Sequence, residues 1–101
     1  MKIRFEWDPA KAKSNLRKHR VSFEVATRVF ADPYAFAAQD RIKNGECRWQ
    51  TLGIVDGRLL LLVAHTVRDD ENGIEVIRII SARRAEPNER RRYEENCPLY
   101  G

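Results

Sequence analysis

Residues 47–80, CRWQTLGIVDGRLLLLVAHTVRDDENGIEVIRII, decide the fold. They contain three runs, at 47–55, 58–67 and 74–80, that are rich in β-branched, leucine and aromatic side chains, as strands are. Asp56-Gly57 separates the first two runs, and both residue types tolerate the positive φ of a tight type I′ turn. The stretch therefore predicts consecutive antiparallel strands joined by hairpins.

The pattern continues toward the N-terminus. Residues 34–40 form a further strand-like run, and Lys43-Asn44-Gly45 provides the turn that follows it. Together the four runs predict an antiparallel meander.

The first third of the chain predicts one more strand and two helices. Residues 2–7 alternate between apolar and charged side chains, which indicates a half-buried strand. Asp8-Pro9 is a typical helix start, and the following helix, AKAKSNLRKH, is expected to turn Ala12 and Leu16 inward. Ser22 then precedes FEVATRVFA, whose apolar residues recur at helical spacing.

A third helix is predicted at the C-terminal end, because Glu86 and Glu89 flank Pro87 in the spacing of a capping box. The expected fold class is α+β: an antiparallel β-sheet with two N-terminal helices and one C-terminal helix, in the order β-α-α-β-β-β-β-α. At 101 residues the chain is expected to form a single domain, 1–101.

The positive charge of the chain is concentrated in one segment. Residues 78–92, RIISARRAEPNERRR, hold six arginines and two glutamates, and this local excess of +4 equals the net charge of the whole chain. Arginine matches phosphate with a planar fork of donors. The segment therefore indicates a nucleic-acid binder, with a solvated helix face as the alternative.

Other classes of protein are disfavoured. The longest apolar run, residues 59–64, is too short to cross a membrane, and no apolar signal-peptide core follows Met1, so a cytoplasmic protein without membrane contact is expected. Cys47 and Cys97 are expected to be reduced. The sparse histidines and cysteines lack metal-ligand spacing, and there is no glycine-rich phosphate loop, so neither metal nor cofactor is expected.

Segments along most of the chain resemble the BrnT toxins, small ribonuclease toxins of type II toxin–antitoxin pairs related in fold to RelE. The resemblance spans about residues 7 to 95, and the matching residues are Asn15, Leu16, Lys18, His19, Val21 to Glu24, Ala26, Gly57 to Leu59, Thr66, Arg68, Ile77 to Arg83, Ala85, Glu89, Arg90 and Tyr93. The resemblance implies a RelE-like fold and a metal-independent endoribonuclease that acts on RNA.

Two positions depart from the family pattern. Arg20 stands where such toxins usually have a glycine, and arginine in the left-handed conformation of a helix end costs on the order of 1 kcal/mol. His65 stands where tyrosine or phenylalanine is as frequent, so the family pattern does not itself imply a histidine mechanism.

Cleavage of RNA by its own 2′-OH requires a base, an acid and positive charge for the crowded phosphorane. The expected catalytic residues are Arg68, Arg83 and His65, with Glu46 and Tyr93 as rival bases. His65 and Arg68 should face opposite sides of their strand unless a bulge intervenes, which favours Arg68 over His65. The antiparallel pairing does not by itself bring Arg68 and Arg83 together.

The expected RNA-binding residues are Arg78, Arg90, Tyr93 and Lys43. Some of the catalytic and RNA-binding candidates have a structural alternative: His65 could be a packed core residue, Tyr93 a packing residue of the last helix, and Arg78 a structural arginine paired with Glu75 or Glu6.

The resemblance also implies partners. They are an RNA substrate and a cognate antitoxin of the ribbon-helix-helix type, with operator DNA bound only through that antitoxin. Two further functions stay open at this point: a ParE-like inhibitor of a topoisomerase without catalysis, and a nucleic-acid-binding co-repressor.

Overall fold

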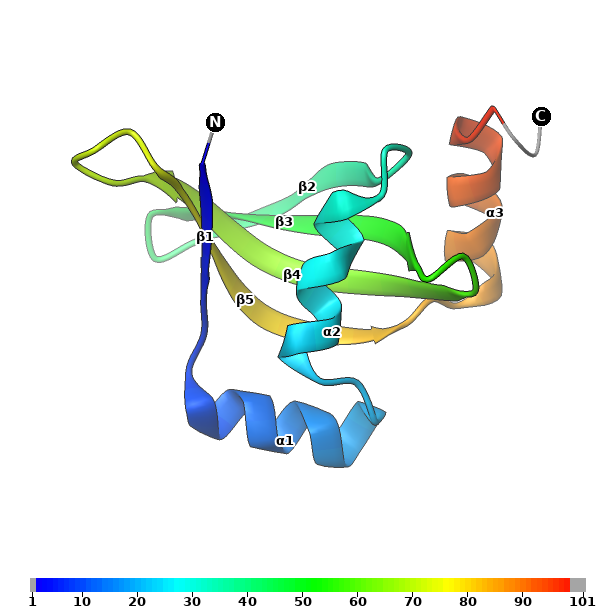
Figure 1. Ribbon diagram of the computed structural model, residues 1–101, viewed down its shortest axis with the longest axis horizontal. Helices are drawn as coiled ribbons and strands as arrows, with labels where there is room; N and C mark the ends of the chain where they lie inside the picture. The colour runs from blue at the N-terminus through cyan, green and yellow to red at the C-terminus, as the bar shows by residue number, and fades with distance from the viewer. Residues whose placement is uncertain (1, 99–101) are drawn as a thin grey trace.

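The computed structural model describes residues 2–98 and confirms the expected order of elements (Figure 1). The second helix is divided into an α-helical and a 3₁₀ part, α2 and η1. The elements are β1 (Ile3–Glu6), α1 (Pro9–His19), α2 (Phe23–Thr27), η1 (Arg28–Ala31), β2 (Phe36–Lys43), β3 (Glu46–Val55), β4 (Leu59–Asp69), β5 (Glu75–Arg84) and α3 (Pro87–Asn96).

The strands form one five-stranded sheet in the order β1-β5-β4-β3-β2. Strands β2 to β5 are the expected antiparallel meander. β1 joins the free edge of β5 in parallel, from Ile3 opposite Glu75 to Glu6 opposite Arg78, so the sheet is mixed. The alternation within β1 indicated a strand but carried no information about the direction of its neighbour.

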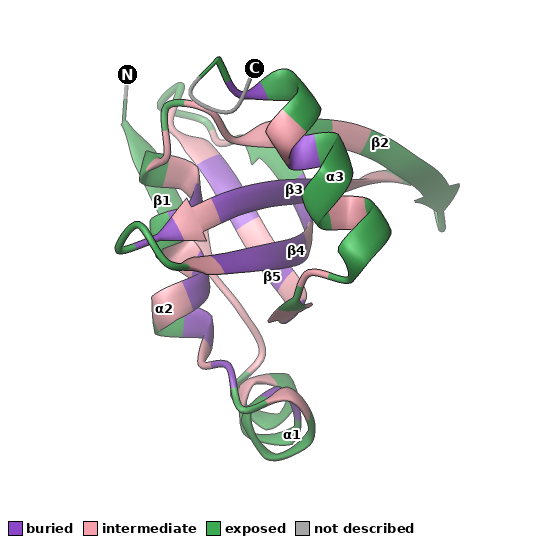
Figure 2. Ribbon diagram, turned by 90° about the vertical axis from the view of Figure 1, so that its right-hand side faces the viewer, coloured by how far each residue is buried: buried purple, intermediate pink, exposed green. Residues whose placement is uncertain are grey.

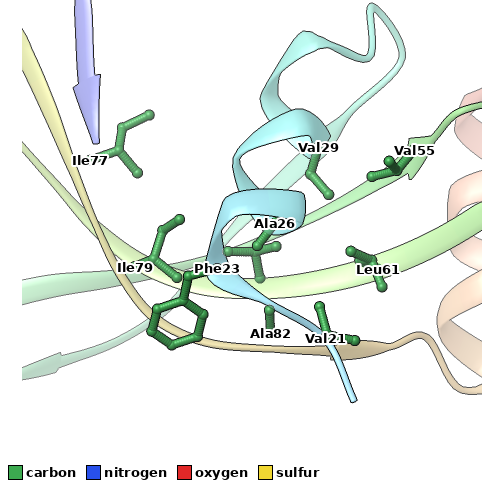
Figure 3. Packing of buried hydrophobic residues seen from close by; sticks show 10 residues of the cluster. Val21, Phe23, Ala26, Val29, Val55, Leu61, Ile77, Ile79 and Ala82 are labelled. Atoms are coloured by element: carbon green, nitrogen blue, oxygen red, sulfur yellow. The ribbon is translucent and has the colours of Figure 1, made fainter. Parts of the chain in front are cut away.

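The helices lie on both sides of the sheet (Figure 2). On one side, α2 and η1 place Phe23, Ala26 and Val29 against the sheet residues Leu61 and Ile79 (Figure 3). On the other side, Tyr93 of α3 and the adjoining Cys97 pack against leucines of β3 and β4, namely Leu52, Leu60 and Leu62. We call the first the α2 face and the second the α3 face.

Close packing on the α2 face depends on Gly53 of β3. A Cβ at this position would lie 2.6 Å from Cγ1 and 2.9 Å from the carbonyl oxygen of Val29. Both distances are too short for van der Waals contact, so glycine allows η1 to lie directly on the sheet.

The inward face of α1 differs from the expectation. Leu16 is 49% exposed, whereas Asn15 is buried. Asn15 Nδ2 donates to the carbonyl oxygens of Val21 (3.0 Å) and Ala82 (2.8 Å), and its Oδ1 accepts from Ala82 N (3.1 Å). The side-chain amide thus pairs with the backbone N–H and carbonyl groups of β5 at a position where β1 has ended. The inward position predicted for Leu16 is wrong.

The ends of the helices follow the sequence signals. Asp8 caps α1 by accepting from Ala10 N at 2.8 Å, and Glu86 and Glu89 form the expected capping box of α3. Arg20 ends α1 in the left-handed conformation, with φ 61° and ψ 27°. None of the helices within residues 2–98 is long and apolar enough to cross a membrane.

Candidate nucleic-acid interface

A line of polar side chains crosses all five strands on the α3 face. The register places Arg41 opposite Arg48, Arg48 opposite Thr66, Thr66 opposite Arg78, and Arg78 opposite Glu6. Cross-strand partners project to the same side of a sheet. These five residues, which we call the arginine row, therefore share one face and span about 19 Å over four strand spacings.

One end of the arginine row is a compact charged cluster. Arg68, two residues beyond Thr66 on β4, donates from Nη2 to Glu6 Oε1 at 2.5 Å. Arg78 Nη1 lies 3.6 Å from the other carboxylate oxygen, Glu6 Oε2. The side chains of Arg68 and Arg78 are 50% and 44% exposed, so both guanidinium groups face solvent. The structure thus brings Arg68 and Arg78 together around one carboxylate.

Arg48 gives the middle of the row an unused donor. Its Nε atom is buried and has no hydrogen-bond partner within residues 2–98. A buried N–H without a partner is unfavourable.

Arg83 lies on the same face but farther along β5, opposite Leu62. Thr66, the partner of Arg78, lies four positions beyond Leu62 on β4, so Arg83 lies about 13 Å from the row along the strands. Its two terminal nitrogens each donate to Glu89 of α3 at 2.8 Å. The hydrogen-bonded Glu89 carboxylate raises the pKa of Arg83, and the Arg83 guanidinium in turn lowers the pKa of Glu89. The structure therefore ties Arg83 to α3 and does not place it beside Arg68.

The remaining basic candidates lie at the borders of this face. Lys43 is exposed at the end of β2, two residues beyond Arg41, and pairs in register with Glu46 at the hairpin. Arg90 is exposed on α3. Arg92 extends from α3 over the ring of Phe36 on β2, with its guanidinium carbon 5.3 Å from the ring centroid.

Tyr93, an expected RNA-binding residue, is only 2% exposed, and its hydroxyl donates to Asp32 Oδ2 at 2.6 Å. Asp32 also accepts from the backbone N–H groups of Ile54 and Tyr34. Burial acts to raise the pKa of Asp32, but these hydrogen bonds outweigh it, and the pKa lies below its usual value. Tyr93 is therefore packed between α3 and the sheet, as in the packing alternative, whereas its contact with RNA stays a prediction.

His65 lies on the α2 face, opposite to Arg68, and is 3% exposed. Its Nε2 is 2.7 Å from Thr51 Oγ1, and its ring packs edge-on against Phe30 with centroids 4.9 Å apart. Burial lowers the pKa of His65, although a backbone interaction with Thr66 opposes the shift. The pairing of β4 with β5 is irregular between Ala64 and His65, and the additional residue lies on β5. The side chains of β4 therefore still alternate between the two faces of the sheet. His65 is not brought to the arginines.

Sequence reasoning named Glu6 only as a structural partner of Arg78, a contact that the structure confirms, and it did not assign Arg41 or Arg48 to the site. Each lies on a different strand, and only the cross-strand register aligns them. Within the described residues there is no group of three or more histidine, cysteine or acidic side chains that could hold a metal ion. The face can bind an anion through several guanidinium groups that are held by the sheet.

Two comparisons with known proteins identify relatives of this chain. Residues 7–89 match the model of a family described as ribonuclease toxin, BrnT, of type II toxin–antitoxin systems. Among solved structures, the ribonuclease toxin BrnT of Brucella abortus, a crystal structure at 1.1 Å resolution, superposes with a TM-score of 0.58 at 20% sequence identity. The match covers 85% of this chain and 99% of that one. No curated protein matches the sequence.

Proposed function

The chain belongs to the BrnT family of ribonuclease toxins of type II toxin–antitoxin systems, and from this premise we propose that it cleaves RNA on the α3 face, along the arginine row. The observation that supports the proposal most directly is the row itself. It gathers Arg41, Arg48 and Arg78 from three strands onto one solvent-facing surface, with Arg68 beside them.

The reaction we propose is an attack of the 2′-OH on the adjacent phosphate. Arg68 and Arg78 stabilise the charge that develops on the phosphorane, because their guanidinium groups are fixed on neighbouring strands before the substrate binds. Arg48 and Arg41 hold the flanking backbone, and Lys43 and Arg90 extend the basic border. The attacking group comes from the RNA, so the proposed cleavage is metal-independent and uses no cofactor.

Arg83 and His65 take different roles in this proposal. Arg83 contributes a phosphate contact near α3, outside the reacting centre, because Glu89 fixes it about 13 Å from Arg78. His65 stabilises the fold from the α2 face and takes no part in proton transfer. The whole chain acts as one domain in the cytoplasm.

The proposal is tested by incubating the purified chain with a fluorescent single-stranded RNA in the presence of EDTA. We expect endonucleolytic cleavage that leaves 2′,3′-cyclic phosphate ends. Intact RNA with folded protein would contradict the proposed activity, and cleavage that depends on added Mg²⁺ would contradict metal independence. A topoisomerase inhibition assay on the same preparation examines the ParE-like alternative, which the family match does not favour.

A type II toxin has an antitoxin partner. The proposed partner is a small ribbon-helix-helix protein that covers the α3 face with an acidic segment and connects the complex to operator DNA. The positive excess of the chain, most of it on or next to β5 and α3, supports an acidic partner. Expression of the chain alone should arrest growth, and coexpression of the neighbouring small protein should restore it.

A further inference from the structure

Glu6 occupies an unusual position for a carboxylate in an anion-binding surface. It is the last residue of β1, lies at the end of the arginine row, and contacts both Arg68 (2.5 Å) and Arg78 (3.6 Å). Its side chain remains 32% exposed, so it is accessible from solvent. An RNA phosphate bound by these two arginines would lie next to this carboxylate.

Stability alone is a weak reason for this arrangement. Ion pairs whose partners are half exposed contribute little to folding, because solvent screens the two charges. A negative charge beside the phosphate site opposes RNA binding. A carboxylate in this position therefore weakens substrate affinity, and a direct action of the carboxylate on the bound substrate would offset that loss.

The other bases considered for this reaction are badly placed. His65 lies on the α2 face and is buried, and Tyr93 is buried between α3 and the sheet. Glu46 lies at the hairpin between β2 and β3, at the opposite edge of the sheet from β1. Of the carboxylates within residues 2–98, Glu6 is the one in ion-pair contact with Arg68 and Arg78.

We propose that Glu6 is the general base of RNA cleavage, an inference that rests on the proposed ribonuclease function. Glu6 takes the proton from the 2′-OH, the 2′-oxygen forms a bond to phosphorus, and the bond from phosphorus to the 5′-oxygen breaks. The leaving 5′-oxygen takes a proton from water, and Glu6 releases its proton to solvent. The products are a 2′,3′-cyclic phosphate and a 5′-hydroxyl, so atoms and charge balance.

The test is Glu6→Gln, which keeps the size of the side chain and removes the base. We expect kcat to fall by about 10²- to 10⁴-fold. Affinity for a 2′-O-methyl RNA, which cannot be cleaved, should be unchanged or higher because a negative charge has left the surface. The pH–rate profile should lose its acidic limb. A purely structural role for Glu6 would not lower kcat while strengthening binding.

Two further variants complete the experiment. Glu6→Asp keeps the carboxylate on a shorter side chain, so its rate should lie between those of wild type and Glu6→Gln. Asp56→Asn removes the carboxylate of a different exposed ion pair, with Arg28, and should cleave at the wild-type rate. If the wild type does not cleave RNA, the proposed function fails. If the wild type cleaves and folded Glu6→Gln cleaves within about threefold of it, the base assignment is overturned.

Discussion

His65 and Arg68 lie three residues apart on β4 and face opposite sides of the sheet. His65 contacts Thr51 and Phe30 on the α2 face, whereas Arg68 contacts Glu6 on the α3 face. The strand keeps a regular register with β3 between Arg48–Thr66 and Val55–Leu59, so no bulge in β4 brings the two side chains to one site. The geometry of the folded chain therefore does not bring the two side chains to the same phosphate, which disfavours a mechanism that uses both.

His65 should make the stability of the fold depend on pH. Burial lowers its pKa from 6.5, so the unfolded chain binds a proton more readily than the folded chain. The contribution of the neutral His65 to the free energy of unfolding is therefore complete above about pH 6.5. It is lost as the pH falls toward the lowered pKa of the folded chain. Urea denaturation at pH 7.5 and 5.5 should show wild type less stable at pH 5.5.

The matched variants are His65→Gln and His19→Gln, since His19 lies at the end of α1, away from this packing. His65→Gln should lower the free energy of unfolding by about 1 to 3 kcal/mol at pH 7.5. The stability of this variant should no longer differ between pH 7.5 and 5.5, and its cleavage rate per folded molecule should be that of wild type. His19→Gln should retain the pH dependence. A fall in cleavage in folded His65→Gln would return the histidine to the mechanism.

Asn15→Ala should be strongly destabilising. The substitution leaves the N–H of Ala82 and the carbonyl oxygens of Ala82 and Val21 without their partner at the edge of β5. Each of these three unsatisfied buried groups costs about 1 to 3 kcal/mol, so the free energy of unfolding should fall by at least about 3 kcal/mol. Leu16→Ala is the control and should change stability by less than about 0.5 kcal/mol. Equal losses for the two variants would contradict the edge-closing role of Asn15.

Arg20→Gly should stabilise the chain by about 0.5 to 1 kcal/mol, because glycine adopts the left-handed conformation of this helix end without the strain of a Cβ. Thermal denaturation checks the sign. Lys13→Gly, on the exposed side of the same helix, should instead destabilise by about 1 kcal/mol. A loss of stability in Arg20→Gly would show that the arginine side chain contributes more than the conformational strain removes.

These elements show which parts of the structure were predictable from sequence. Period-two patterns and the Asp56-Gly57 turn define the meander, since both signals are local along the chain. The partner of β1 was not predictable, because alternation marks a strand and not its neighbour. Asn15 was matched to the family, but its role depends on a contact 67 residues away.

The site was predictable only in part. Arg68 and Arg78 were identified as single arginines, but their common partner, Glu6, is 62 residues from Arg68 in sequence. The arginine row depends on the registers of four strand pairs, including an irregularity between Gln39 and Arg41 that brings Arg41 opposite Arg48. A shift of one residue in any strand would turn its side chain to the other face. Such alignment is a property of the folded sheet.

The arginine row should be essential for cleavage. Arg78→Ala and Arg48→Ala should each lower kcat/KM by about 10²- to 10³-fold without unfolding the chain, because each removes positive charge from the phosphate site. Arg28→Ala is the control: its side chain is also exposed and ion-paired, but it lies on η1 next to Asp56. Similar losses for Arg28→Ala and Arg78→Ala would indicate nonspecific electrostatics instead of a defined row.

Arg83 should behave as a binding residue and not as a catalytic one. Arg83→Ala should weaken binding of 2′-O-methyl RNA, and the slope of log K against log salt should fall by about 0.7, as expected for one lost phosphate contact to a single strand. At saturating RNA its kcat should stay close to that of wild type, because the side chain lies about 13 Å from Arg78 along the strands.

Glu89→Gln provides the complementary test, because it releases Arg83 from a carboxylate that now engages both of its terminal nitrogens. RNA binding should become tighter in this variant. The ion pair that joins α3 to β5 is lost, so the free energy of unfolding should fall by up to about 1 kcal/mol, the range for a partly exposed ion pair. If Arg83→Ala instead lowers kcat as much as Arg78→Ala and leaves the salt slope unchanged, Arg83 acts at the reacting phosphate. RNA would then have to displace Glu89 from Arg83, since in the present structure that carboxylate occupies the fork of donors that a phosphate needs.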